Sequence, residues 1–222
     1  MSESSREYST VVEDILKLVW SAEEAGRDGV KPKDIGDHMG VVPSTTTENV
    51  QRLVRQGLVT HERYGRVRLT EQGRAVALGM VRRHRLLETY LHEALGFSWD
   101  EVHEEAEILE HAVSERLLDR LDKVLGYPTR DPHGDPIPRA DGSSDEVPGA
   151  PLDRLSVGEG GIVERLPDRD PQALRAWEEV GLVPGVSVVV VARAPGELTV
   201  VLDDGQMVQL EEALASGVIV RD

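Results

Sequence analysis

Four side chains that could bind a metal ion recur in a short stretch near the middle of this sequence. His103, Glu107 and His111 follow one another at intervals of four residues, and Glu110 lies beside His111. An α-helix turns by about 100° per residue, so these four side chains would share one helical face. The adjoining stripe is apolar and consists of Val102, Ala106, Leu109 and Val113. The pattern therefore places the four groups at the edge of a core, where a metal site can form.

Three further candidate ligands lie earlier in the chain. His84 and Glu88 have the same four-residue spacing in the preceding helical segment, and Asp14 lies on the first predicted helix. The alternative interpretation is a solvated glutamate face with incidental histidines, and for Asp14 a solvated helix charge. Two clusters on consecutive helices favour the metal site. Oxygen-rich sites with one or two imidazoles suit Mn²⁺ and Fe²⁺.

The composition excludes several classes of protein. The chain of 222 residues contains no cysteine, which excludes disulfides, thiolate zinc sites and thiol catalysis. The polar N-terminus leads into no apolar run of signal or membrane-spanning length. We therefore expect a cytoplasmic protein without a membrane partner.

The N-terminal third has the element order of a winged helix-turn-helix. Apolar periodicity predicts a helix over 9–25, short helices over 31–39 and 43–56, and a β-hairpin over 58–70 centred on Tyr64-Gly65. In the helix over 43–56, Thr46, Val50 and Leu53 would face inward. The polar side chains left outward on that helix are Ser44, Thr45, Thr47, Glu48, Gln51 and Arg52. They could contact bases or phosphates, or they could be an ordinary polar helix face.

The charge distribution bears on this interpretation. A formal net charge of −16 argues against a nucleic-acid partner, because phosphates attract basic surfaces. Between residues 49 and 86, however, arginines far outnumber acidic residues. Arg63, Arg66 and Arg68 on the hairpin suit phosphate or minor-groove contact. The acidic excess lies elsewhere in the chain.

The remaining two thirds divide into a helical and a β-rich part. Helices are predicted over 71–95, from a capping box at Ser98 and Glu101 onward, and over 114–125. After a linker rich in Pro, Gly, Asp and Ser, strands alternate with turns and one helix over 171–180. We expect a mainly α protein with a small β part, organised as a winged helix-turn-helix domain (1–74), a helical domain with the candidate metal ligands (75–126), a linker (127–151) and an SH3-like β-barrel (152–222).

The order of these motifs resembles the diphtheria-toxin-repressor family of metal-dependent transcriptional repressors. The resemblance rests on the winged helix, on residues 80–88 (MVRRHRLLE), on the His/Glu helix and on residues 131–138 (DPHGDPIP). It implies a regulatory metal site at Asp14, Glu107, Glu110 and His111, and an ancillary site at His84, Glu88 and His103, hence two sites per subunit. It also implies that residues 75–126 are a helical dimerisation and metal-binding domain, and that the protein is a homodimer that binds palindromic double-stranded operator DNA.

The resemblance also indicates the metal. Manganese-responsive members carry acidic residues at the positions of Asp14 and Glu107, whereas iron-responsive members carry Met and Cys. We therefore expect a repressor activated by Mn²⁺ that controls metal-uptake genes, with Fe²⁺ as the alternative ion. In the tail, Asp170 stands where the family has a Glu ligand and is a candidate metal ligand. Ala173 replaces a Gln ligand, so coordination by the tail is either weakened or uses Gln172 instead.

Two other classes compete with a metal-dependent repressor. A His/Glu metalloenzyme is one, but the sequence shows no nucleophile constellation or phosphate-binding loop. A winged-helix sensor of an organic ligand is the other, but a single Phe leaves little to line an aromatic pocket. We therefore expect neither enzymatic activity nor an organic substrate.

Overall fold

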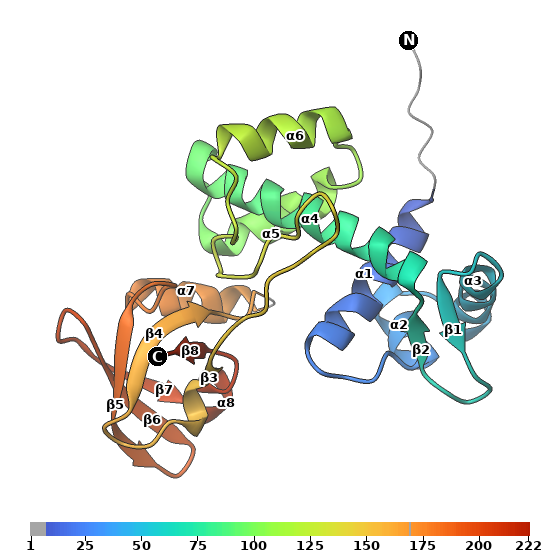
Figure 1. The fold of residues 1–222 in the computed structure, drawn as a ribbon. Helices are drawn as coiled ribbons and strands as arrows, with labels where there is room; N and C mark the ends of the chain where they lie inside the picture. Colours follow the sequence, from blue (N-terminus) through green and yellow to red (C-terminus); the bar gives the residue numbers. More distant parts are fainter. Residues whose placement is uncertain (1–7, 169) are drawn as a thin grey trace. The chain divides into compact units, whose positions relative to one another are not determined.

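The computed structural model describes residues 8–168 and 170–222 and divides into two compact units. The first contains the described residues up to Arg83 together with Pro138–Ser143, and the second contains His84–Ile137 and Ser144–Asp222. Helix α4 (Glu71–Leu95) runs from the first unit into the second (Figure 1). The four-domain division expected from the sequence is finer than these units and stays a prediction.

The first unit is the winged helix-turn-helix that the sequence predicted. Its elements are α1 (Thr10–Glu24), α2 (Pro32–Met39), α3 (Pro43–Arg55), β1 (Val59–His61) and β2 (Val67–Leu69), followed by the start of α4. Prolines open α2 and α3, where the missing N–H costs no helical hydrogen bond. Gly40, with a φ of 63°, ends α2 in the left-handed conformation that glycine adopts without strain.

The core of this unit follows the predicted apolar faces. On α1 the buried residues include Ile15, Leu16 and Val19, and on α3 they are Thr46, Val50 and Leu53. Strands β1 and β2 pair antiparallel, with Val59 opposite Leu69. Because α3 and β1 pack in the same small core, α3 and the hairpin are held in one body. We call α3 the reading helix, after its expected contact with DNA, and the hairpin the wing.

The helical part of the second unit comprises the end of α4, α5 (Trp99–Leu109) and α6 (Glu115–Val124). The capping box between Ser98 and Glu101 is present at the start of α5. The predicted ligand helix is shorter than expected, however, since α5 ends at Leu109 and His111 lies in the following turn. Ser114 then accepts a hydrogen bond from the Leu117 amide and starts α6, so a second cap follows too soon for α5 to continue.

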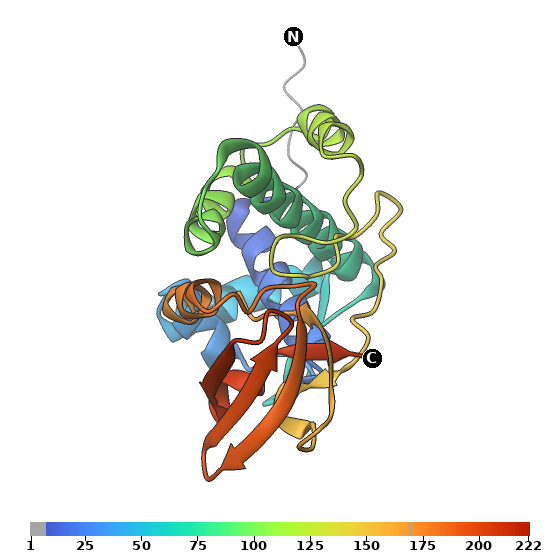
Figure 2. The same ribbon diagram turned by 90° about the vertical axis from the view of Figure 1, so that its left-hand side faces the viewer.

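The C-terminal part contains a six-stranded sheet in the order β3-β8-β4-β5-β6-β7. The strands of this sheet are the yellow-to-red arrows in Figure 2. Its elements are β3 (Ala150–Pro151), a 3-10 turn (Leu152–Arg154), β4 (Gly160–Arg165), α7 (Pro171–Glu179), β5 (Ser187–Ala194), β6 (Glu197–Leu202), β7 (Met207–Glu211), α8 (Glu212–Ala215) and β8 (Ile219–Arg221). The expected SH3-like fold is confirmed, but the prediction that its sheet closes into a barrel was wrong. Over the described residues β3 and β7 remain unpaired edges, because β3 has only two residues and both pair with β8.

The sheet domain packs against the helical part of the same unit. Trp99 of α5 joins the core cluster formed by Leu174, Trp177 and the inner faces of the strands. Asp100 forms an ion pair with Arg175 of α7 at 3.1 Å. Among the described residues, no helix is long and apolar enough to cross a membrane.

Part of the predicted linker is buried in the second unit. Within residues 131–137, here called the strap, Asp131, His133, Asp135 and Ile137 are all buried. The Leu166 amide donates to the His133 carbonyl at 2.9 Å, which fixes the strap against the segment after β4. Gly134 has a φ of +91°, and a Cβ there would lie 2.0 Å from the Glu164 carbonyl oxygen, so only glycine fits this approach.

Candidate metal centre and nucleic-acid interface

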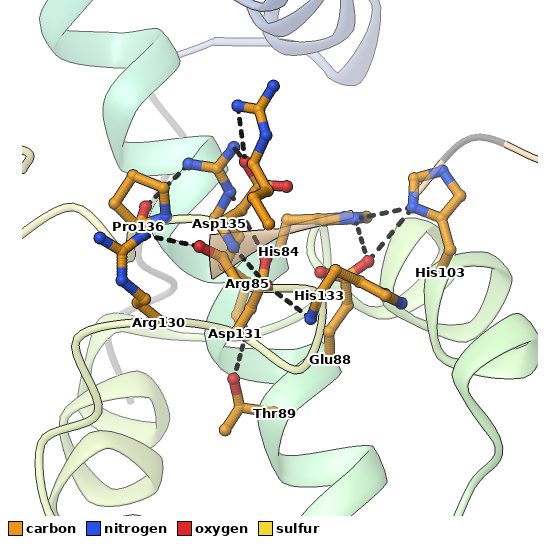
Figure 3. A network of polar contacts seen from close by, with 12 residues as sticks. His84, Arg85, Glu88, Thr89, His103, Arg130, Asp131, His133, Asp135 and Pro136 are labelled. Atoms are coloured by element: carbon orange, nitrogen blue, oxygen red, sulfur yellow. Dashed lines mark hydrogen bonds and ion pairs between the residues drawn. The ribbon is translucent and has the colours of Figure 1, made fainter. Parts of the chain in front are cut away.

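His84 lies at the centre of a buried polar network at the middle of α4 (Figure 3). Its Nε2 lies 2.9 Å from Glu88 Oε1 and 3.1 Å from His103 Nδ1. His103 Nδ1 is in turn 3.2 Å from Glu88 Oε1. The structure therefore brings together the His84, Glu88 and His103 group predicted from helical spacing, with ligand atoms within 4.8 Å of one another.

The other nitrogen of His84 faces a second pair of carboxylates. Its Nδ1 lies 2.7 Å from Glu110 Oε2 and 3.9 Å from Glu107 Oε1. His111 Nε2 lies 3.5 Å from the remaining oxygen of Glu110. One imidazole thus connects both predicted sites. The sequence assigned His84 to the ancillary group alone, because spacing cannot show that the two ring nitrogens point to different carboxylates.

A third group was missed in the sequence. Glu88, Asp131 and His133 are all buried and present ligand atoms within 4.8 Å of one another. Glu88 Oε2, Asp131 Oδ2 and His133 Nδ1 make no hydrogen bond. Helical spacing predicted no metal site at His133, because no carboxylate precedes it by three or four residues. The available signal was the Asp-Pro-His pattern itself, two potential ligands in a segment too rich in Pro and Gly to be helical.

The second ring nitrogen of His133 supports this group. His133 Nε2 lies 3.3 Å from the backbone carbonyl of Trp99, which can only accept a hydrogen bond. In the neutral form of the ring, the proton therefore lies on Nε2 and the lone pair of Nδ1 faces Glu88 and Asp131. This is the tautomer and the outer hydrogen bond that a metal-ligating histidine needs.

Burial and neighbouring charges shift the pKa values of Glu88 and Asp131 in opposite directions. Burial raises the pKa of Glu88, but the charge of His84 and hydrogen bonds with His103 and His84 outweigh it, so the pKa lies well below its ordinary value. Burial, followed by repulsion from Asp135 and Glu88, holds the pKa of Asp131 well above its ordinary value. Arg85 offsets part of this repulsion, at 3.7 Å from Asp131 and 3.3 Å from Asp135. A divalent cation would neutralise the remaining acidic groups and complete their coordination.

Two further predicted ligands, Asp14 and Asp170, come from α1 and from the start of α7. Asp14 is on α1 in the first unit, and its approach to Glu110 and His111 in the second unit stays a prediction. Asp170 caps α7, where its Oδ1 accepts hydrogen bonds from the Gln172 and Ala173 amides. No metal-capable group found among residues 8–168 and 170–222 includes Asp170. Its coordination of a metal also stays a prediction.

The predicted DNA contacts fall into two sets on the first unit. On α3, Ser44, Thr47, Glu48 and Gln51 are exposed, while Thr45 and Arg52 are half-buried. On the wing, Arg63 is exposed, but Arg66 donates to the Gly29 carbonyl at 3.1 Å. Arg68 forms two hydrogen bonds of 2.6 Å with Asp28. In this structure Arg66 and Arg68 therefore bind the loop between α1 and α2.

Three family models match consecutive parts of the chain. Residues 7–67 match the N-terminal DNA binding domain of iron dependent repressors, and residues 70–139 match their metal binding and dimerisation domain. Residues 150–222 match the FeoA domain.

Individual relatives cover nearly the whole chain. The iron-dependent repressor IdeR of Mycobacterium tuberculosis is 31% identical over 96% of this chain and 97% of its own length. A solved manganese-dependent transcriptional repressor in complex with manganese has a TM-score of 0.89 at 46% identity, covering 95% of this chain and 100% of that one. The manganese regulator SloR has a TM-score of 0.76 at 32% identity, with 95% and 98% covered. These relatives are transcriptional repressors and regulators, and not enzymes.

Proposed function

Because the chain belongs to the iron-dependent repressor family of metal-dependent, DNA-binding transcriptional repressors, we propose that Mn²⁺ is the ion that activates it. In this role the metal-bound protein binds operator DNA and represses genes of metal uptake. The single observation that carries the proposal is the buried network around His84, in which carboxylates of Glu88 and Glu110 face opposite nitrogens of one imidazole.

The ligand chemistry supports a hard or borderline divalent ion. Every side chain in the candidate groups offers oxygen or imidazole nitrogen, and the chain contains no cysteine. Such donor sets suit Mn²⁺ and Fe²⁺, whereas thiolates would favour softer ions. Several structural relatives are named as manganese-dependent or manganese-activated repressors, which favours Mn²⁺ over Fe²⁺ here.

Two ions per subunit would use the two sides of His84. One site comprises Asp14, Glu107, Glu110 and His111, with His84 Nδ1 facing its carboxylates. The other lies around Glu88, which faces His84 and His103 on one side and Asp131 and His133 of the strap on the other. The bound ion would supply positive charge among the buried carboxylates. The surrounding residues would select the ion and hold it in place.

Activation follows from the order of the ligands along the chain. Asp14 precedes the reading helix, while Glu107, Glu110 and His111 follow it. An ion held by both sets of ligands would favour one placement of the winged helix. DNA that binds this placement would then be bound more tightly in the presence of the ion. Asp14→Asn should therefore abolish the Mn²⁺ dependence of DNA binding while the fold is retained.

The test is a fluorescence titration of duplex DNA selected from a random pool by the Mn²⁺-loaded protein. Exposed Asp37 on α2 provides a matched control, and Asp37→Asn should behave as wild type. If Asp14→Asn binds with unchanged Mn²⁺ dependence, the mechanism is wrong. Replacing Glu107 by Cys and Asp14 by Met should shift activation toward Fe²⁺, and an unchanged ratio of the two midpoints would contradict the proposed basis of metal choice.

The functional unit that we propose is a two-fold homodimer on a palindromic site. One reading helix spans few base pairs, so a symmetric pair doubles the readout. In the second unit, α5 and α6 expose Ile108, Leu117 and Val124, of which Val124 is 72% exposed. These apolar side chains suit the dimer contact. A monomer in sedimentation at micromolar concentration, with and without Mn²⁺, would contradict it.

A further inference from the structure

Strand β4 departs from regular pairing at Glu164. Its neighbours Val163 and Arg165 lie opposite two consecutive residues of β8, so Glu164 is an extra residue and forms a β-bulge. Successive side chains of a regular strand point to opposite faces, but a bulge changes their direction. Both residues here form ion pairs at the strap. Arg165 pairs with Asp135 at 3.3 Å, while Glu164 pairs with Arg130, which directly precedes the strap.

The Glu164 carboxylate connects two arginines from distant parts of the chain. Its Oε1 lies 2.6 Å from Nη2 of Arg130, and its Oε2 lies 2.6 Å from Nε of Arg221 on β8. The Arg130 guanidinium also donates through Nη1 to the Gly134 carbonyl at 2.7 Å. We call Glu164, Arg130 and Arg221 the clamp. It fixes the middle of the strap to two strands of the sheet.

The clamp acts on the backbone beside His133. The His133 carbonyl accepts a hydrogen bond from the Leu166 amide, and the next carbonyl, that of Gly134, accepts one from Arg130. A metal ligand has to be held within about 0.5 Å of its productive position by the residues around it. The metal-capable groups of the described segments do not include Glu164 itself. Its influence on a bound ion would therefore pass through the strap backbone.

We propose that Glu164 is a positioning residue for the metal site around Glu88. The inference rests on the proposed function, since it concerns one of the two proposed Mn²⁺ sites. Through Arg130, Glu164 holds the strap in the position in which Asp131 and His133 present their ligand atoms to Glu88. The C-terminal sheet thus contributes to metal affinity through a residue that does not bind the ion.

The test is Glu164→Gln in the full-length protein, titrated with Mn²⁺ while electron paramagnetic resonance measures the free ion. Gln keeps the shape of Glu but lacks the charge that both arginines contact. The side chains of Arg130 and Arg221 are 28% and 45% exposed, so the variant leaves no buried cation and should fold. The affinity for one of the two ions should fall about tenfold, because the orientation of its ligands is loosened. The affinity for the other ion should not change.

Two further measurements separate positioning from a general loss of structure. In the Glu88→Gln protein, which should lack the ion in question, adding Glu164→Gln should not change the affinity for the remaining ion. In EDTA, the Leu166 amide should exchange its hydrogen about fivefold faster in Glu164→Gln than in wild type. The reason is that this amide bonds to the strap carbonyl of His133, which the clamp no longer fixes. The second readout requires no metal.

Arg175 provides the matched control. Its ion pair with Asp100, at 3.1 Å, also joins the sheet domain to the helical part but does not involve the strap. Arg175→Gln should therefore bind both ions as wild type does. The inference is overturned if Glu164→Gln keeps wild-type affinity for both ions, if it weakens both equally, or if Arg175→Gln causes the same loss. A wild type that binds no more Mn²⁺ than Glu88→Gln would instead refute the proposed site, and the inference with it.

Discussion

Replacing Glu88 by Gln tests whether the buried network on α4 is a metal site. The Glu88 side chain is fully buried, with Oε1 at 2.9 Å from His84 Nε2 and 3.2 Å from His103 Nδ1. Gln keeps the shape of Glu but removes the charge that both imidazoles contact. Without metal, the weakened charge-assisted contacts should lower the free energy of unfolding by about 1–3 kcal/mol.

In the presence of Mn²⁺, Glu88→Gln should also lose the stabilisation that the bound ion gives to the folded state. An ion present at about 100 times its dissociation constant stabilises the folded state by about 2.7 kcal/mol. For a chain of this size, that corresponds to a rise in melting temperature of about 5–11 °C. Glu88→Gln should lose this rise for the site around Glu88, and the metal content should fall by one ion per subunit.

Thermal unfolding in EDTA and in increasing Mn²⁺, combined with metal analysis of the dialysed protein, measures both quantities. Exposed Glu104 on α5 offers the matched control, because Glu104→Gln removes one charge without touching the network. A Glu88→Gln protein with the wild-type Mn²⁺ increment and metal content would refute the assignment of Glu88 as a ligand. If Glu88→Gln lowers the melting temperature in EDTA but keeps the wild-type Mn²⁺ increment, Glu88 has a purely structural role, and this result would also contradict its assignment as a ligand.

Two further predictions concern the fold that supports the sites. The hydrogen bond from Arg68 lowers the pKa of Asp28, so this carboxylate stabilises the folded state above its unfolded pKa and loses that contribution as the pH falls through its folded pKa. Asp28→Asn should therefore melt below wild type at pH 7 and converge with it toward pH 3; a constant difference would contradict this. Trp99→Ala should lower the free energy of unfolding of the second unit by about 3–5 kcal/mol in urea titration, because Trp99 is 6% exposed within the C-terminal core. A loss below about 1 kcal/mol would mean that α5 does not contribute to that core.

Local patterns were sufficient for most of the fold. Helical periodicity predicted α1, α3 and α4, and the alternation around Tyr64-Gly65 predicted the wing. The elements missed were short: β3, β8 and α8 have two, three and four residues, too few for a periodicity to appear. Closure of the sheet was predicted wrongly because it depends on the pairing of distant edges, which no local pattern contains.

In the candidate metal site, too, local spacing predicted some ligands, whereas others depend on contacts between distant parts of the chain. His84, Glu88 and His103 were predictable because two ligands share one helix and the third lies on the next helix along the chain. Asp131 and His133 were not, because their approach to Glu88 depends on the burial of the strap. Arg85 holds that strap by donating to the Pro136 carbonyl at 2.7 Å and by pairing with Asp135, contacts more than forty residues apart in sequence. The sequence alone indicated a linker there.

Arg66 and Arg68 on the wing show a further limit of predicting DNA contacts from sequence. Arg66 and Arg68 have the residue type and strand position of DNA contacts, yet both bind the loop after α1. Charge and position predict that an arginine is available for phosphate, but a nearby carboxylate such as Asp28 competes for the same guanidinium. Only the tertiary structure shows which partner is within reach.

The most direct test of metal-activated repression is the thermodynamic coupling between the ion and the operator. The affinity of the protein for operator DNA is measured in EDTA and in saturating Mn²⁺, and its affinity for Mn²⁺ is measured with and without the operator. If metal binding selects the DNA-binding placement of the winged helix, Mn²⁺ should tighten DNA binding, and DNA should tighten Mn²⁺ binding by the same overall factor. Equal operator affinity in EDTA and in Mn²⁺ would contradict the account.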